Sequence, residues 1–226
     1  MDTQAPASRG RIDIISDAIC PWCYIGKRHL ETALPLLAAE GLQFDVHWHP
    51  YQLNPDMPEA GVDRAEYRRQ KFGNDPERIA GMDRRVAEAG AAVGLSFRHD
   101  LMRRTPNTIA AHRVIWLAGL HGVQDAVVEA LFRAYFTEGQ DIGDPTTLID
   151  IADAAGLDRR LTAAMLDGAQ YRNEVESEDD MARRSGLNGV PAFTMLGHVL
   201  FTGAVPADVM VEAFAKAWKV LSKQAA

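Results

Sequence analysis

The chain has 226 residues, of which 47% are hydrophobic and 24% charged, and its formal net charge at pH 7 is −7. This composition is typical of one ordinary globular core or two small ones. An acidic chain without a run of Lys and Arg is a poor candidate for binding nucleic acid or an anionic membrane, and no apolar stretch approaches the roughly 18 to 20 residues that span a bilayer.

The N-terminal stretch MDTQAPASRGR has an acidic second residue and lacks the apolar core of a secretory signal. We therefore expect a cytoplasmic protein. Thiols in the cytosol are normally kept reduced, and the disulfides that form there are usually transient, catalytic or sensing.

Two strands and a helix are predicted at the start of the chain. Residues 11–16 are a short apolar stretch typical of a buried strand. A helical pattern of apolar residues begins at Cys20, and Gly41 ends it. Residues 42–53 then alternate apolar and polar side chains, which predicts a second strand. This opening is a βαβ unit.

The middle of the chain predicts helices and almost no strand. Residues 64–184 are rich in Ala, Arg, Glu and Leu, and the apolar residues recur with the helical period. Glycine and proline breaks fall at 73–76, 105–106, 139–145 and Gly156. These breaks divide the stretch into five or six helices.

The C-terminal part returns to strands. Residues 191–196 and 199–203 are apolar and rich in β-formers, and Gly197 and His198 between them predict a two-residue hairpin turn. A final helix follows Pro206.

The order of predicted elements indicates an α/β fold in which the sheet is split along the sequence. The N-terminal βαβ half occupies residues 1–62 and the C-terminal ββα half occupies residues 187–226. An all-helical insertion, residues 63–186, lies between the second and third strands of the sheet.

Cys20 and Cys23 are the only cysteines of the chain. Because they stand three residues apart at the start of a helix, both side chains can lie on one face. Cys20 belongs to the first turn, where free N–H groups and the positive end of the helix dipole stabilise a thiolate, the reactive form. Cys23 lies one turn deeper. We therefore expect Cys20 to attack a disulfide and Cys23 to resolve the mixed disulfide.

Two other uses of the cysteine pair are less favoured. A permanent disulfide would close only a tiny loop and would restrict the unfolded chain little. A zinc site needs further ligands at suitable spacing. Of the scattered histidines only His47 and His49 are close together, so a Cys2His2 site is conceivable but lacks the usual spacing. We expect no bound metal.

A lone C-x-x-C that follows a strand and opens a helix is typical of thioredoxin-like redox proteins. Four stretches resemble the DsbA-like thioredoxin superfamily, and more narrowly its FrnE-like branch: ICPWCYIGKRHLE (19–31), HPYQLNPDMP (49–58), NTIAAHR (107–113) and GVPAFTMLGHVLFTGAVP (189–206). They span nearly the whole chain in the family's order. The resemblance implies a thioredoxin fold with a large helical insertion and a thiol–disulfide oxidoreductase activity.

The resemblance also implies roles for particular residues. Cys20 takes the place of the nucleophile, Cys23 of the resolving cysteine, and Pro191 of a cis proline that faces the nucleophile at the start of the third strand. An X–Pro bond costs little in the cis form, and the backbone of Val190 would be free to pair with an extended substrate. Trp22 could form an apolar platform for substrate or cover Cys23.

The NTIAAHR stretch contains three further residues to consider. His112 lies on an apolar helical stripe, where we expect a core histidine with a local hydrogen bond. Asn107 and Thr108 stand at a helix start, so helix capping explains them most simply. Their place in the family pattern makes contact with substrate an alternative.

Three functions from different classes remain open. The first is an oxidoreductase that exchanges disulfides with protein or small-molecule thiols, with a redox-active cysteine pair in place of a bound cofactor and glutathione as a candidate cosubstrate. The second is a glutathione-dependent isomerase or transferase, resembling 2-hydroxychromene-2-carboxylate isomerases and kappa-type glutathione transferases. Those proteins share the NT..AHR pattern but typically carry serine where Cys20 stands. The third is a non-catalytic binding module or holdase. The two cysteines favour the first.

Overall fold

The computed structural model describes residues 9–223. The expectation about a secretory signal rests largely on residues 1–8, which lie outside the described residues. In chain order, the elements are β1 (Arg9–Ser16), α1 (Pro21–Ala39), β2 (Gln43–Pro50), β3 (Val62–Asp63), α2 (Arg64–Phe72), α3 (Pro76–Ala91), β4 (Arg104–Thr105), α4 (Ile109–Leu120), α5 (Gln124–Phe136), α6 (Pro145–Ala154), α7 (Arg159–Asp167), α8 (Arg172–Arg184), β5 (Ala192–Met195), β6 (His198–Thr202) and α9 (Ala207–Leu221).

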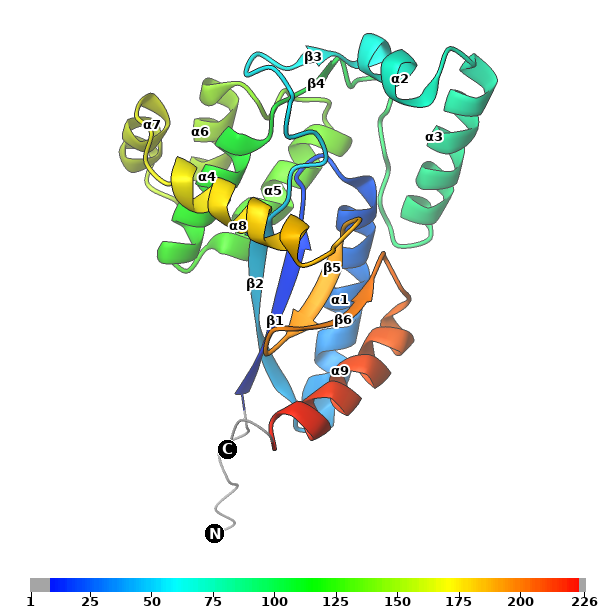
Figure 1. The fold of residues 1–226 in the computed structure, drawn as a ribbon, viewed down its shortest axis with the longest axis vertical. Helices are drawn as coiled ribbons and strands as arrows, with labels where there is room; N and C mark the ends of the chain where they lie inside the picture. Colours follow the sequence, from blue (N-terminus) through cyan, green and yellow to red (C-terminus); the bar gives the residue numbers. More distant parts are fainter. Residues whose placement is uncertain (1–8, 224–226) are drawn as a thin grey trace.

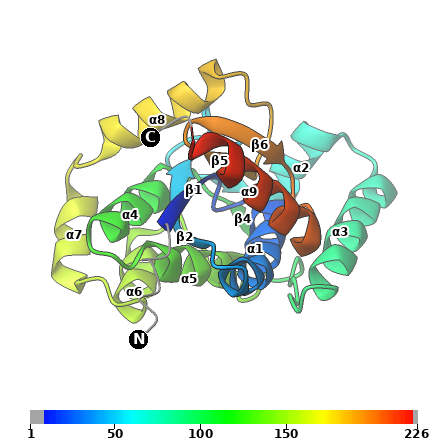
Figure 2. The same ribbon diagram turned by 90° about the horizontal axis from the view of Figure 1, so that it is seen from below.

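The main sheet has four strands in the order β2-β1-β5-β6. β1 and β2 run parallel, whereas β5 is antiparallel to both β1 and β6. Figures 1 and 2 show α1 and α9 together on one face of this sheet and α8 across the other. The predicted α/β fold, with a βαβ half and a ββα half, is therefore confirmed.

Helix α1 begins and ends as its sequence predicts. Pro21 occupies the first helical turn, where its missing N–H has no helical partner to lose. Gly41 adopts φ 81°, a left-handed conformation that glycine reaches without strain. The amide of Leu42 then donates to the carbonyl of Leu37 over 2.9 Å and closes the helix end.

The β5–β6 hairpin turns one residue earlier than the sequence predicts. Met195 pairs with His198, so the two-residue loop consists of Leu196 and Gly197. Their φ angles are 49° and 79°. The prediction of Gly197 and His198 is wrong because hairpins of this kind need positive φ at both loop residues, and here Leu196 takes the first position.

The insertion contains seven described helices, α2 to α8, and not five or six. The additional boundaries lie around Gly122, with φ 73°, and Tyr171, with φ 62°, where the backbone leaves the helical region. The insertion also contains two short strands, which the sequence does not predict. β3 and β4 pair antiparallel, so the two ends of the α2–α3 segment are fastened to each other.

One hydrophobic cluster runs through the sheet and the helical insertion. Its contacts include the stacked rings of Tyr24 in α1 and Phe132 in α5, with centroids 5.0 Å apart. Beside them the fully buried Lys27 of α1 donates to Asp125 of α5 over 3.1 Å. The insertion therefore completes the core beside α1 and β2, and the sequence ranges 1–62, 63–186 and 187–226 remain a predicted domain division.

The outer edge of β2, the one not paired with β1, is held by a side chain of the insertion. Gln124 at the start of α5 accepts from the backbone N–H of Trp48 over 2.9 Å and donates to its carbonyl over 3.0 Å. This side chain takes the place of a neighbouring strand. Within residues 9–223 the structure has no helix both long enough and apolar enough to cross a membrane.

Candidate active site

Cys20 is the N-cap of α1, and it stands where β1 turns into that helix. Its backbone is extended, with φ −92° and ψ 112°. Its amide donates to the carbonyl of Asp17 over 3.0 Å, and its own carbonyl accepts from the amide of Cys23 over 3.0 Å. Both thiols are free. The site therefore has a sulfur at the positive end of a 19-residue helix.

The two thiols differ in their surroundings. Cys20 is 4% exposed and Cys23 is fully buried. Burial, together with hydrogen bonding and charge interaction with Cys20, raises the pKa of the Cys23 thiol well above its ordinary value. The Ser16 side chain and the Asp17 backbone oppose this rise less strongly. Cys23 is therefore held as a protonated thiol behind Cys20.

Val190 and Pro191 follow the insertion in the sequence, but they lie next to Cys20 in the structure. The Cys20 Sγ lies 3.5 Å from the carbonyl oxygen of Val190 and donates to it. The Val190–Pro191 peptide bond is cis. A Cβ at Gly26 would stand 3.1 Å from the Pro191 ring, so the glycine leaves room for that ring against α1. The pairing of β5 with β1 thus places Val190 beside a sulfur 170 residues away in the sequence.

Cys20 opens into a pocket of about 370 Å³ between the start of α1 and the α2–α3 segment. Trp22 also lines this pocket and is 41% exposed. The pocket is lined by Ile19, Cys20, Pro21, Trp22, Leu53, Arg64, Tyr67, Arg68, Lys71, Phe72, Met82, Asp83, Val86, His99, Thr105, Tyr135, Phe136, Gly189 and Val190. A cavity of this size is within the range of small-molecule sites.

Several pocket residues are absent from the sequence predictions, among them Arg64, Tyr67, Lys71 and Tyr135. Helix α2, which carries three of them, has no fully buried residue and a strongly polar sequence. In the sequence it resembles an ordinary solvated helix, and only the tertiary structure, with the β3–β4 pairing, shows that it lines the pocket at Cys20. The EYRRQK stretch contains no spacing that could have signalled the site.

Asn107 and Thr108 are not among the residues that line this pocket. The Asn107 side chain donates to the carbonyl of Met57 over 2.7 Å and accepts from the amide of Ile109 over 2.9 Å. Thr108 is 3% exposed and is the N-cap of α4 without a side-chain capping bond. The structure thus shows Asn107 fastening a loop to α4, and substrate contact by either residue stays a prediction.

His112 is buried, as its apolar stripe predicts, but its Nε2 has no hydrogen-bond partner among the described residues. Its Nε2 lies 3.4 Å from Oδ1 of the fully buried Asp17. The other Asp17 oxygen accepts from the amide of Leu53 over 2.7 Å. Asp17 therefore fastens the β1–α1 turn to the segment after β2 and sets the position of the turn that carries Cys20.

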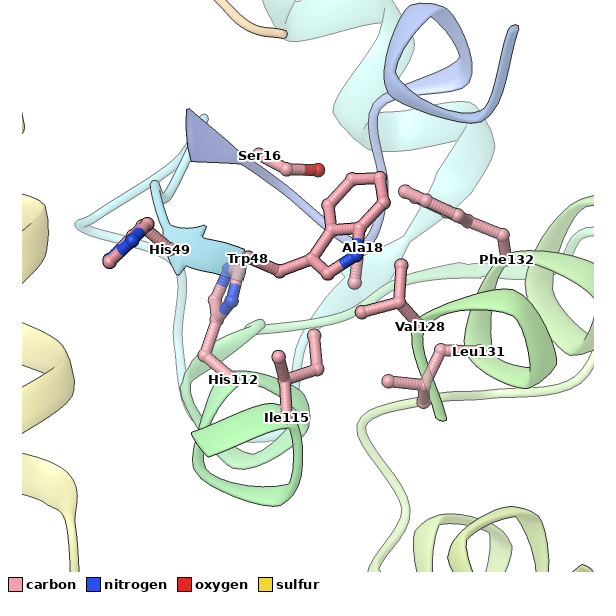
Figure 3. Close-up of a pocket in the computed structure, with 9 residues that line it drawn as sticks. All are labelled: Ser16, Ala18, Trp48, His49, His112, Ile115, Val128, Leu131 and Phe132. Atoms are coloured by element: carbon pink, nitrogen blue, oxygen red, sulfur yellow. The ribbon is translucent and has the colours of Figure 1, made fainter. Parts of the chain in front are cut away.

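A second, closed cavity lies on the inner side of β2 (Figure 3). Trp48 and His112 project into it from β2 and α4, opposite Val128 and Leu131 of α5. Its volume is about 10 Å³, room for no more than one water molecule. This cavity is too small for a substrate, and the pocket at Cys20 is the candidate site.

The described residues contain no group of three or more His, Cys, Asp and Glu side chains arranged to hold a metal ion. His49, one of the two histidines considered as zinc ligands, is engaged elsewhere. Its ring nitrogens lie 2.8 Å from Asp13 and 3.0 Å from Glu178. The conceivable Cys2His2 arrangement is therefore not formed.

Comparisons with known proteins place this architecture in a family. The family described as the DSBA-like thioredoxin domain matches residues 11–215. A probable DsbA oxidoreductase from Streptomyces coelicolor is 30% identical, with a TM-score of 0.83 over 93% of this chain and 91% of that one.

Two further proteins are more distant. The uncharacterized protein YwbO of Bacillus subtilis is 25% identical over 89% of this chain and 94% of its own length. The cytosolic disulfide reductase DsbM from Pseudomonas aeruginosa, solved with GSH, shares the fold at 20% identity, with a TM-score of 0.62 over 91% of this chain and 99% of that one. With the family match over most of its length and a cysteine pair at the start of the helix that follows β1, the chain belongs to the DSBA-like thioredoxin domain family.

Proposed function

We propose that the protein is a thiol–disulfide oxidoreductase in which Cys20 attacks and Cys23 resolves. The observation that carries this proposal is the asymmetry of the pair. Cys20 caps a helix and opens into a pocket, whereas Cys23 is fully buried behind it with a raised pKa. Such a pair suits two sequential exchange steps in which one sulfur meets the substrate and the other does not.

The reaction transfers two electrons. The Cys20 thiolate attacks one sulfur of a substrate disulfide, breaks the substrate S–S bond and releases the first substrate thiolate, which takes up a proton. Cys23 then loses its proton and attacks the Cys20 sulfur of the mixed disulfide. The Cys20–Cys23 bond forms, the second substrate thiolate leaves, and the enzyme dithiol has been oxidised while the substrate disulfide has been reduced. The reverse sequence oxidises a substrate dithiol.

The surroundings of Cys20 supply further proposed contacts. Trp22 offers a partly exposed indole at the pocket, and the Val190 carbonyl stands 3.5 Å from the attacking sulfur. We assign the protein to the cytoplasmic, FrnE-like branch because of its sequence motifs. The similar fold of DsbM, a cytosolic disulfide reductase solved with GSH, supports glutathione as a cosubstrate.

Reduction of insulin by dithiothreitol tests the function directly. We expect the wild-type protein to accelerate insulin precipitation and Cys20→Ser to abolish that acceleration. Mixed with insulin in the absence of dithiothreitol, Cys23→Ser should accumulate a mixed disulfide on Cys20, visible as a mass increase that later addition of dithiothreitol removes. Full turnover by Cys20→Ser would contradict the assignment of the nucleophile.

A glutathione-dependent isomerase is the alternative, and it rests on the NTIAAHR resemblance. It predicts that Cys20→Ser, which installs the serine typical of those proteins, binds reduced glutathione and retains activity on an aromatic substrate. Calorimetry with reduced glutathione separates the two functions. No measurable binding to either the reduced wild type or Cys20→Ser would remove the isomerase.

Protection of an unfolding client that survives replacement of both cysteines would indicate a holdase.

A further inference from the structure

The pocket beside Cys20 holds more positive than negative charge, although the chain as a whole is acidic. Its only lining carboxylate among the described residues is Asp83. Asp83 pairs with Arg68 through both oxygens, at 2.5 and 2.8 Å. His99 adds no charge at neutral pH, because burial lowers its pKa. Arg64 and Lys71 are therefore left as cations that no pocket carboxylate neutralises.

Arg64 is the deeper of the two cations. Its Nη1 donates to the Tyr135 hydroxyl over 3.2 Å, and its buried Nε has no hydrogen-bond partner in the described structure. None of the described carboxylates lies within the 4.0 Å of an ion pair with it. Tyr135 cannot compensate the charge, since burial raises its pKa to about 12 and the phenol stays neutral. The buried Asp17 is engaged with Leu53 and His112.

Lys71 stands on the same helix, two turns further along. Its Nζ donates to Asn54 Oδ1 over 2.8 Å and to the Tyr67 hydroxyl over 2.7 Å, and it lies 5.2 Å from the centre of the Tyr67 ring. All of these partners are neutral. The described part of the chain gives Lys71 no carboxylate within ion-pair distance either.

We propose that this pocket binds a carboxylate on the thiol or disulfide substrate, with Arg64 as its main partner and Lys71 as the second cation. The inference deepens the proposed function and rests on it. A guanidinium with a free Nε–H binds a carboxylate through two parallel hydrogen bonds, a geometry that a lysine does not offer. The pocket volume of about 370 Å³ suits a small acidic thiol compound.

A series of small disulfides that differ only in charge tests the proposal. The three probes are 3,3′-dithiodipropionate, bis(2-hydroxyethyl) disulfide and cystamine, which carry two negative charges, none and two positive charges. The rate of oxidation of the reduced enzyme is divided, for each probe, by its rate with dithiothreitol, because leaving-group pKa alone changes the rate. We expect the corrected rate to be about tenfold higher for the dianion than for the neutral probe, and lowest for cystamine.

Substitutions locate the effect. Arg64→Gln should remove most of the preference for the dianion, Lys71→Gln should reduce it by a smaller factor, and Arg64→Lys should retain part of it. Arg85→Gln is the matched control, since Arg85 lies on α3, does not line the pocket and changes the net charge equally. Lys71 is exposed, so its variant keeps the test valid if Arg64→Gln does not fold.

The outcomes separate this inference from the proposed function. Equal corrected rates for all three probes, or an unchanged preference in Arg64→Gln and Lys71→Gln, would overturn the carboxylate site and leave the oxidoreductase standing. If no probe reacts, the oxidoreductase fails, and calorimetry of 3,3′-dithiodipropionate with the Cys20→Ser, Cys23→Ser double variant still decides the site. Binding that Arg64→Gln weakens about tenfold supports it, and no binding overturns it.

Discussion

At the scale of single residues, burial makes two chemically identical thiols unequal. Cys20 and Cys23 are separated by one helical turn, yet Cys20 lines the pocket while Cys23 lies behind it without exposure. Withdrawing a sulfur from water penalises its thiolate, and a neighbouring thiolate penalises it further. The proposed order of attack rests on these surroundings, since the residue that is deprotonated only with difficulty is also the one a substrate cannot reach.

This inequality predicts selective alkylation. At pH 7 iodoacetamide should modify Cys20 in the reduced protein and leave Cys23 unmodified, because alkylation needs both access and a thiolate. Peptide mass spectrometry after a timed reaction measures the two sites. In urea both cysteines should react, which controls for recovery of the peptides. Comparable rates at the two positions in the folded protein would contradict the asymmetry on which the mechanism depends.

At the scale of elements, helix α8 is fastened to the end of β2 by polar contacts. His49 of β2 bridges Glu178 of α8 and Asp13 of β1. The Asp179 carboxylate accepts from the amide of Gln52 over 2.9 Å, and Arg183 donates to the Gln52 carbonyl. Since α8 leads directly into the Val190–Pro191 segment, these contacts help to hold that segment in place beside Cys20.

The His49 bridge predicts a loss of stability in mild alkali. Burial opposes its protonation, but the hydrogen bonds and charges of Asp13 and Glu178 outweigh burial and raise the His49 pKa from 6.5 to about 9. Between these values the folded protein holds a proton that the unfolded chain has released. The contribution of protonated His49 to the free energy of unfolding is therefore complete below about pH 6.5 and is lost as pH rises through about 9. Its upper limit is about 3 kcal/mol.

Urea unfolding at intervals from pH 6 to 10 measures this effect. The free energy of unfolding of the wild type should fall across that range more steeply than that of His49→Gln, whose side chain does not titrate. The difference between the two proteins cancels the titration of other groups. Parallel curves for the two proteins would show that the bridge does not hold a proton.

At the scale of the whole molecule, the helical insertion does not behave as an appendage to the sheet. The buried cluster joins Ile12 and Ile14 of β1, Tyr24 of α1, and Phe132 and Phe136 of α5 without interruption. If the insertion separated from the sheet, Tyr24 and its neighbours would be exposed to water, which costs about 25 cal/mol of free energy per Å² of apolar surface. The cysteine pocket lies at the junction of the two parts, so its shape depends on their packing.

A shared core predicts cooperative unfolding of the two parts. Urea transitions followed by tryptophan fluorescence and by far-ultraviolet circular dichroism should coincide, although the chain exceeds the size at which two-state behaviour is usual. Trp218 of α9, which packs on Phe44 of β2, reports on the sheet half, and Trp116 of α4 reports on the insertion, so single-tryptophan variants can monitor each part. Two separated midpoints would show that the insertion is an independent folding unit.

Local sequence was enough to predict most of the architecture and the position of the cysteine pair at a helix start. Helical periodicity, Pro21 and Gly41 set the limits of α1, and alternation and apolar runs predicted the strands, because these depend on neighbours within a few residues. The C-x-x-C spacing at a helix start identified Cys20 and Cys23 for the same reason. The turn at Leu196 and the boundary at Tyr171 escaped prediction because positive φ at such residues is favoured by the surrounding structure and not by their own preference.

The tertiary structure alone decided what surrounds the sulfurs. Arg64 and Lys71 lie on a polar helix more than 40 residues from Cys20 in the sequence, and the β3–β4 pairing carries that helix over the pocket. Asp17 acquires His112 as a neighbour only through the packing of α4. The placement of the two cysteine sulfurs is thus specified by short-range backbone geometry, whereas the charge and shape of the pocket arise from contacts between distant segments, which form only when the insertion and the sheet bury a common core.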